Sequence, residues 1–135
     1  INRLNGRGVR VRQRNQLEYF MAQFQEFTFD QGADTSIELH LVDKNGAAKN
    51  LAGHTIAAKI KKNYADSAGE ATSFTTSVTN AGAGIVVLTL TNSQTAALRA
   101  GRHVYDIEMS YQDSSANTIV ERILEGRIQV TPQVT

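Results

Sequence analysis

The chain of 135 residues contains no cysteine, no tryptophan and one proline, and aromatic residues make up 7% of it. The absence of cysteine excludes disulfide bonds, thiolate metal sites and a cysteine nucleophile within this sequence. No apolar run approaches the roughly 18 residues that a membrane-spanning helix requires. The stability of the fold must therefore come from packing and hydrogen bonding, and we expect no membrane insertion.

Motifs that carry catalysis or cofactor binding are also missing. The sequence has no G-x-S-x-G elbow and no G-x-x-x-x-G-K-[ST] phosphate loop. Its three histidines, His40, His54 and His103, show none of the spacings that are typical of metal ligands. We therefore predict no enzyme, no catalytic residue, no cofactor, no metal site and no small-molecule substrate.

Alternating apolar and polar residues are the strongest positive signal. They occur around Phe27 and Phe29, in 36–41, in 55–61 and in 103–111, with turn residues between the runs. The apolar run "IVVLTL" (85–90) is typical of a central strand. About seven short strands at this spacing predict an all-β fold, an antiparallel β-sandwich of immunoglobulin-like type, over residues 25–135.

Two local features refine this sandwich. In "TNSQTAALRAG", Asn92 or Ser93 is expected to cap one short helical turn, and Gly101 is expected to end it. In the last strand, Val120, Leu124, Ile128 and Val130 share a parity and are expected to face the core. Gly126 has the same parity and indicates a bulge or a close approach of another strand.

The pair Asp106 and Glu108 raises the question of acid–base chemistry. Both residues occupy even positions of "HVYDIEMSY", whereas Tyr105, Ile107 and Met109 occupy odd positions. Because strand side chains alternate between faces, the carboxylates share the solvent face and the apolar side chains share the core. We interpret this segment as a half-buried strand without catalytic function.

The charge is unevenly distributed. Five arginines, Arg3, Arg7, Arg10, Arg12 and Arg14, lie in the first 14 residues, where there is no acidic residue. Removing these five from the 14 basic residues leaves nine against 13 acidic residues, so that the remainder carries a charge near −4. Residues 1–24 are therefore interpreted as a basic and apolar N-terminal arm on a mildly acidic domain.

Three interpretations of this arm remain open. The alternation of valine and arginine in 9–12 suits a strand that adds to a sheet edge of a neighbouring subunit. Alternatively, the arm is solvated or folds locally, or its arginines contact the phosphates of nucleic acid. Under the first interpretation the docking residues are Arg3, Arg7, Val9, Arg10, Val11, Arg12, Arg14, Leu17, Tyr19 and Phe20.

Three blocks of sequence resemble a known family. The first contains Asp43, Gly46, Leu51 and Gly53; the second contains Leu90, Thr91, Thr95, Leu98, Gly101, Tyr105, Asp106 and Ile107; the third contains Leu124, Gly126, Val130, Pro132, Val134 and Thr135. Together they resemble the immunoglobulin-like domains of tailed-phage virion proteins, particularly the N-terminal domain of phage baseplate upper proteins. His103 stands where that pattern has a tyrosine.

The resemblance implies a non-enzymatic structural protein of a tailed bacteriophage, most simply a tail or baseplate subunit. Its partners would be other virion proteins and copies of itself, and its location would be the virion, assembled in the host cytoplasm. Capsid decoration and a neck position are alternatives. A host- or carbohydrate-binding module is a further alternative, for which Tyr64, Tyr105 and Tyr111 are the candidate stacking residues outside the arm.

Overall fold

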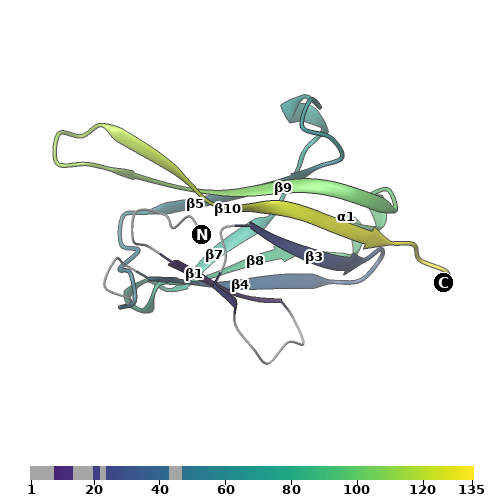
Figure 1. The fold of residues 1–135 in the computed structure, drawn as a ribbon, viewed down its shortest axis with the longest axis horizontal. Coiled ribbons are helices and arrows are strands. Elements are labelled where there is room, and N and C mark those ends of the chain that lie inside the picture. The colour runs from purple at the N-terminus through teal and green to yellow at the C-terminus, as the bar shows by residue number, and fades with distance from the viewer. Residues whose placement is uncertain (1–7, 14–19, 22–23, 43–46) are drawn as a thin grey trace.

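The computed structural model describes residues 8–13, 20–21, 24–42 and 47–135, which form two sheets packed face to face (Figure 1). One sheet has the strand order β2-β1-β4-β8-β7 and the other has the order β3-β10-β9-β5-β6. The strands are β1 (Gly8–Gln13), β2 (Phe20–Met21), β3 (Phe24–Asp30), β4 (Thr35–Val42), β5 (Thr55–Lys61), β6 (Thr72–Ser73), β7 (Thr75–Asn80), β8 (Ile85–Leu90), β9 (Gly101–Gln112) and β10 (Thr118–Thr131).

The strand order confirms the predicted immunoglobulin-like sandwich. In that fold, strands A, B, E and D form one sheet and strands C, F and G form the other. Here β1, β4, β8 and β7 take the first set of positions, and β5, β9 and β10 take the second. The A strand is divided, because β1 pairs antiparallel with β4, whereas β3 pairs parallel with β10 in the opposite sheet.

The observed sheets extend the predicted pattern in two respects. Ten strands are described instead of about seven, and two of them, β2 and β6, have only two residues each. The β3–β10 pairing is parallel, in contrast to the antiparallel pairing of the other described strands. Hydrophobic alternation carries no information on strand direction, so this pairing was not predictable from the residue pattern.

The core lies between the sheets and follows the predicted alternation. Ile37, Leu39 and Leu41 of β4 are buried, as are Ile56, Ala58 and Ile60 of β5. From the central strand β8, Val86, Leu88 and Leu90 enter the same cluster. Each large aliphatic side chain buried in this way contributes about 1.5–3 kcal/mol to the free energy of folding, so these rows are the main stabilising element.

The predicted helical turn is present, but both its N-cap and its C-terminal end differ from the predicted residues. Helix α1 spans Asn92–Ala97, and its N-cap is Thr91 instead of Asn92 or Ser93. The Thr91 hydroxyl accepts from Gln94 N at 3.3 Å, while Gln94 Oε1 accepts from Thr91 N at 2.9 Å, which is a capping box. The helix ends at Leu98, and Gly101 begins β9. Two short 3₁₀ turns, η1 (Ala68–Glu70) and η2 (Ala81–Ala83), were not predicted.

A β-bulge in β10 corrects the predicted orientation of Val120. The register between β10 and β9 shifts between Arg122 and Leu124. Beyond the shift, Leu124, Ile128 and Val130 are buried as predicted, whereas Val120 is 57% exposed. The extra residue, Ile123, exchanges the two faces of the strand, so Val120 lies on the side opposite to the core.

The parallel pairing of β3 with β10 depends on Gly126. A Cβ atom at this position would lie 2.1 Å from the carbonyl oxygen of Gln25, far inside contact distance. The same carbonyl accepts a hydrogen bond of 2.6 Å from the hydroxyl of Tyr105, the residue paired with Gly126 on β9. Of the two roles predicted for Gly126, the close approach is therefore the correct one, and the bulge lies three residues earlier.

We expect Gly126→Ala to destabilise the protein by about 1–3 kcal/mol, because the added methyl group must push β3 away from β10. Urea unfolding followed by circular dichroism measures this difference. Gly69→Ala is the matched control, since the nearest atom to its Cβ would be the Ser67 hydroxyl at 3.9 Å. Equal stability of the Gly126→Ala variant and the wild type would contradict the packing described for this strand pair.

Candidate docking interface and surface groove

The predicted docking residues fall into two groups. Val9, Arg10, Val11 and Arg12 lie in β1, and Phe20 begins β2. The others, Arg3, Arg7, Arg14, Leu17 and Tyr19, lie outside the described residues. The extended conformation predicted from the valine–arginine alternation is confirmed for 8–13.

Strand β1 pairs with β4 of its own chain. The register runs from Gly8 opposite Val42 to Gln13 opposite Ile37, and Arg12 is paired with Glu38. On its other edge β1 pairs with β2, where Val11 is opposite Phe20. Residues 8–13 therefore belong to the same sheet as β4, which is the locally folded alternative. Docking of the arm on a neighbouring subunit stays a prediction.

The edge of β4 that receives β1 has two different faces. Ile37, Leu39 and Leu41 point into the core, whereas Glu38 and His40 are half-buried on the outer face. His40 Nε2 lies 2.5 Å from Glu38 Oε2. The backbone groups of this edge bind β1 through main-chain hydrogen bonds, a mode of recognition that any extended strand of suitable alternation satisfies.

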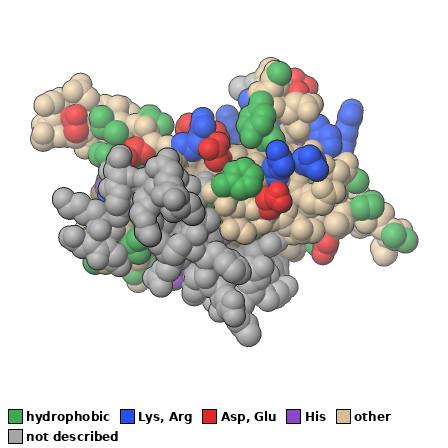
Figure 2. Space-filling view, in the orientation of Figure 1, with side chains coloured by type: hydrophobic (Ala, Val, Ile, Leu, Met, Phe, Trp, Pro, Cys, Tyr) green, Lys and Arg blue, Asp and Glu red, His purple; other side chains and the backbone are tan. Residues whose placement is uncertain are grey.

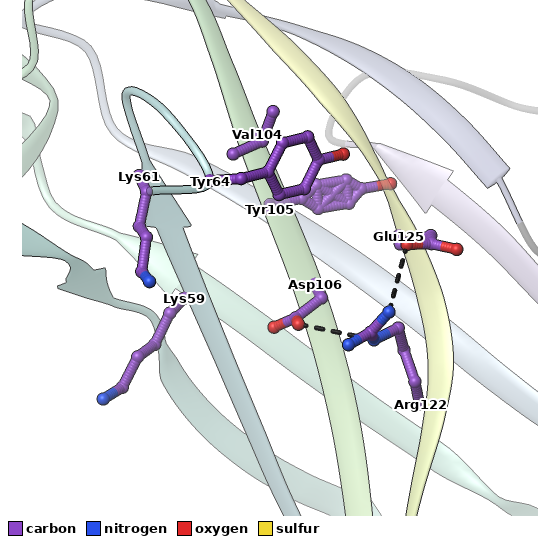
Figure 3. Close-up of a pocket in the computed structure, with 8 residues that line it drawn as sticks. All are labelled: Lys59, Lys61, Tyr64, Val104, Tyr105, Asp106, Arg122 and Glu125. Carbon is purple, nitrogen blue, oxygen red and sulfur yellow. Dashed lines mark hydrogen bonds and ion pairs between the residues drawn. The ribbon is translucent and has the colours of Figure 1, made fainter. Parts of the chain in front are cut away.

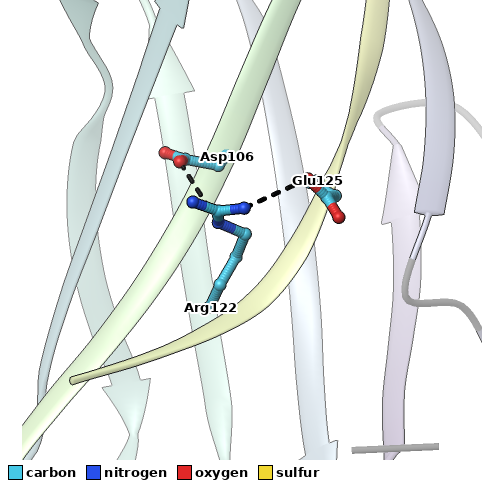
Figure 4. A network of polar contacts seen from close by, with 3 residues as sticks. All are labelled: Asp106, Arg122 and Glu125. Carbon is cyan, nitrogen blue, oxygen red and sulfur yellow. Dashed lines mark hydrogen bonds and ion pairs between the residues drawn. The ribbon is translucent and has the colours of Figure 1, made fainter. Parts of the chain in front are cut away.

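The carboxylates that raised the question of chemistry are part of a surface ion-pair network. Asp106 Oδ2 lies 3.4 Å from Arg122 Nε, and Arg122 Nη1 lies 3.4 Å from Glu125 Oε1 (Figure 4). The three side chains are 40–54% exposed, so water screens these pairs, and each contributes about 1 kcal/mol or less. Glu108 is half-buried on the same face of β9, as predicted.

Each histidine has its own local contacts. His54 Nδ1 lies 3.0 Å from the carbonyl of Ala52, and its ring centroid is 4.8 Å from that of Tyr111. His103 is buried, and its Nε2 lies 2.7 Å from the carbonyl of Arg99, while its Nδ1 has no hydrogen-bond partner in the described part of the chain. Among the described residues, no group of three histidine or acidic side chains is placed to hold a metal ion.

A groove lies on the outer face of the second sheet, with a volume of about 270 Å³. Figure 3 shows the eight residues that line it, which come from β5, the loop after β5, β9 and β10: Lys59, Lys61, Tyr64, Val104, Tyr105, Asp106, Arg122 and Glu125. In the strand register Asp106 is opposite Lys59 on one side and Glu125 on the other. A single row across three strands therefore supplies one ammonium and two carboxylates.

The surface around the groove combines charge with exposed apolar rings. Figure 2 shows basic, acidic and hydrophobic side chains close together in the upper part of the view. Tyr64, in the loop after β5, is 72% exposed. The groove thus places one exposed aromatic ring beside several charged side chains.

The three tyrosines considered for stacking occupy different environments. Tyr105 is buried against Phe27, with ring centroids 5.6 Å apart, and Tyr111 is partly buried against the core. Burial raises the pKa of the Tyr105 hydroxyl far above its ordinary value, with smaller contributions from the negative charges of Glu125 and Glu26. Only Tyr64 of these three presents an open ring to solvent.

The alternation in 55–61 predicts Lys59 and Lys61 on the solvent side of their strand but does not combine them with β9 and β10. The combination depends on the register of β5 with β9 and of β9 with β10. No spacing in the sequence signals this arrangement, because Lys59, Asp106 and Glu125 come from three separate segments.

Comparisons with known proteins give limited information. No model of a protein family matches the chain, and no curated protein matches it. Among solved structures, the chain is similar to AggA, the major subunit of aggregative adherence fimbriae type I from Escherichia coli. That match has a TM-score of 0.30 and 10% identity, and it covers 93% of this chain and 95% of AggA. This similarity is too low to support a conclusion on function.

In the described segments, no helix combines the length and the apolar character needed to cross a bilayer.

Tyr105→Phe should alter the dependence of stability on pH. Since burial holds the pKa above its ordinary value near 10, the neutral hydroxyl contributes its full stability below pH 10. Above pH 10 the unfolded state ionises first, and the wild type should lose up to about 1.4 kcal/mol per pH unit through this group. Urea midpoints at pH 9, 10 and 11 should fall more steeply for the wild type than for Tyr105→Phe.

The control for this comparison is Tyr64→Phe, because the Tyr64 ring is mostly surrounded by water in the folded state as well. Its stability should follow the wild type at every pH. Parallel curves for the wild type and Tyr105→Phe would show that the Tyr105 hydroxyl does not stabilise the fold in the way described.

Proposed function

We propose that this chain is a non-enzymatic structural subunit of a tailed-phage particle, located in the tail or baseplate. In this proposal the sandwich is a rigid body, and the N-terminal arm joins it to neighbouring subunits. Its partners are copies of itself and other virion proteins, with which it assembles in the host cytoplasm. Capsid decoration and a neck position are the alternatives within the particle.

The family resemblance supports this proposal through the sandwich. Several residues of the resembling blocks are buried: Leu51, Leu90, Thr95, Leu98, Tyr105, Ile107, Leu124 and Val130. Gly126 of the third block is the point of closest approach of two strands. The shared residues are therefore those that build the domain. They favour a common structural role, and they contribute nothing to a catalytic one.

The pairing of β1 with β4 is the observation that carries the docking part of the proposal. This pairing uses backbone hydrogen bonds along the six register positions from Gly8 to Gln13. The same bonds form if β1 enters the sheet of an identical neighbour while the neighbour's β1 enters this one. Exchange of an identical element conserves the bonds and is a low-cost route to assembly.

The length of chain between β1 and β3 permits this exchange. Residues 14–23 separate the two strands and include the two residues of β2. Ten residues span at most about 33–36 Å when extended, which is comparable to the diameter of a small domain. A neighbouring sandwich in contact with this one is thus within range of β1.

An engineered disulfide distinguishes pairing within a chain from pairing between chains. Arg12 and Glu38 are directly opposite in the register, so Arg12→Cys combined with Glu38→Cys places two cysteines within disulfide distance in a chain that otherwise has none. Under oxidation the isolated subunit should give monomers with an internal bond, and assembled particles should give covalent multimers.

Two differently tagged versions of this double variant, mixed before assembly, extend the experiment. Bonds between the two tags should appear only in particles. Arg12→Cys alone is the control, and with one cysteine per chain it can give neither an internal bond nor a covalent multimer larger than a dimer. Exclusively internal disulfides in assembled particles would exclude strand exchange.

Deletion of residues 1–14 tests the arm as a whole. The shortened chain should fold, because β3, β4, β5, β8, β9 and β10, which supply most of the described residues of the buried cluster, all lie after residue 14. It should fail to enter particles, because it has lost β1. Far-UV circular dichroism measures folding, and the composition of purified particles measures incorporation. Particles that contain the shortened chain at the same level as the wild type would contradict the docking proposal.

A further inference from the structure

The groove on the second sheet has two lysine ammonium groups along one side, Lys59 and Lys61, without a carboxylate partner among the described residues. Lys59 is exposed, and among the described residues no carboxylate lies within ion-pairing distance of it. Lys61 Nζ donates to the carbonyl oxygen of Asp66 at 3.0 Å, which orients the ammonium group without neutralising it. Both side chains come from β5, and Figure 3 shows them on the same side of the groove.

The opposite side of the groove offers hydrogen-bond acceptors. Arg122 engages Asp106 through Oδ2 and Glu125 through Oε1. In the described part of the chain, Asp106 Oδ1 and Glu125 Oε2 accept no hydrogen bond. Arg122 therefore balances part of their charge and leaves one carboxylate oxygen of each able to accept from a hydroxyl group.

Tyr64 adds a flat apolar surface at the rim. Its ring is 72% exposed, and it lines the groove together with Val104 of β9. An exposed ring of this kind binds the C–H face of a ligand ring, since the face of the aromatic system is negative and apolar. The groove volume of about 270 Å³ lies just below the range of pockets for drug-sized molecules, so it suits one small ring.

These features exclude two ligand classes. An apolar molecule would cover ionised side chains without pairing them, at a high desolvation cost. A polyphosphate or nucleic acid would place phosphate charges directly beside Asp106 and Glu125, whereas a single ring with one carboxylate can direct its charge to the lysines and its hydroxyl groups to the carboxylates. The groove instead combines ammonium donors for one carboxylate, acceptors for hydroxyl groups and a stacking surface for a ring.

We propose that this groove binds a carboxylated pyranose, that is, a uronic acid residue of an acidic polysaccharide. Lys59 and Lys61 bind the carboxylate, Asp106 and Glu125 accept from hydroxyl groups, and Tyr64 stacks on the ring. This site is separate from the strand pairing between β1 and β4. It gives the subunit an adhesive capacity that does not depend on where it is placed in a particle.

The test is an NMR titration of the ¹⁵N-labelled full chain with trigalacturonate. A single stacked ring with a few polar contacts predicts a Kd of about 1 mM. Amide signals should shift along Lys59–Tyr64 and Val104–Asp106. The fully methyl-esterified trisaccharide has the same rings without the charge, and it should bind at least about fivefold more weakly.

Substitutions assign the binding to the groove. Tyr64→Ala should weaken binding by about five- to tenfold, through loss of stacking. Lys59→Ala should weaken the binding of the acid but not of its methyl ester. Phe24→Ala and Arg127→Ala are matched controls, because each removes an exposed aromatic or cationic side chain of the same sheet outside the groove. Both controls should bind as the wild type does.

Three results would overturn this inference. The first is the absence of amide shifts in the groove residues at a trigalacturonate concentration of about 20 times the expected Kd. The second is equal affinity for the acid and its methyl ester, and the third is unchanged affinity in Tyr64→Ala. A single-stranded oligonucleotide that shifts the same amides more strongly would assign the groove to phosphate instead. None of these results bears on the disulfide or truncation experiments. The proposed binding site and the proposed structural role can therefore be contradicted independently of each other.

Discussion

The contact among Tyr105, Gly126 and Gln25 is the constraint on which the sandwich depends. The Tyr105 hydroxyl on β9 reaches the carbonyl of Gln25 on β3, beside the strand β10 that lies between them. It can do so because Gly126 of β10 has no side chain where the two backbones meet. One hydrogen bond thereby links three strands. It supports the β3–β10 ladder, which holds β3 on the second sheet while β1 joins the first, and the A strand is thereby divided between the sheets.

The sequence pattern predicts the residues of the core well, and it predicts their geometry less well. Alternation identifies the inward residues of β4, β5 and β9, because half-buried strands obey a strict period of two. It does not reveal that β3 and β10 are parallel, since apolar alternation is the same in both directions. The cap of α1 was displaced by one residue, because several adjacent polar residues are chemically capable of capping and only Thr91 has Gln94 three positions later.

The arm and the groove show why surfaces are harder to predict than cores. Val9 and Val11 indicate a strand, but the residues of a strand do not specify whether its partner edge belongs to the same chain. The groove is assembled from Lys59, Asp106 and Glu125, which become neighbours only through two strand registers. Each residue separately resembles an ordinary solvated side chain. Their combined chemistry is a property of the topology.

The bulge at Ile123 has a consequence for the end of the β9–β10 hairpin, which extends past the other strands in Figure 1. Because the bulge inserts one residue, every side chain of β10 before Ile123 points to the face opposite to the one that its position parity with Leu124 would give. Val120 and its neighbours at the tip are thereby uncoupled from the parity that the core imposes on Leu124 to Val130. Substitutions at the tip can change its outer surface without a compensating change in the core, so one half of the hairpin is constrained by core packing and the other half is not.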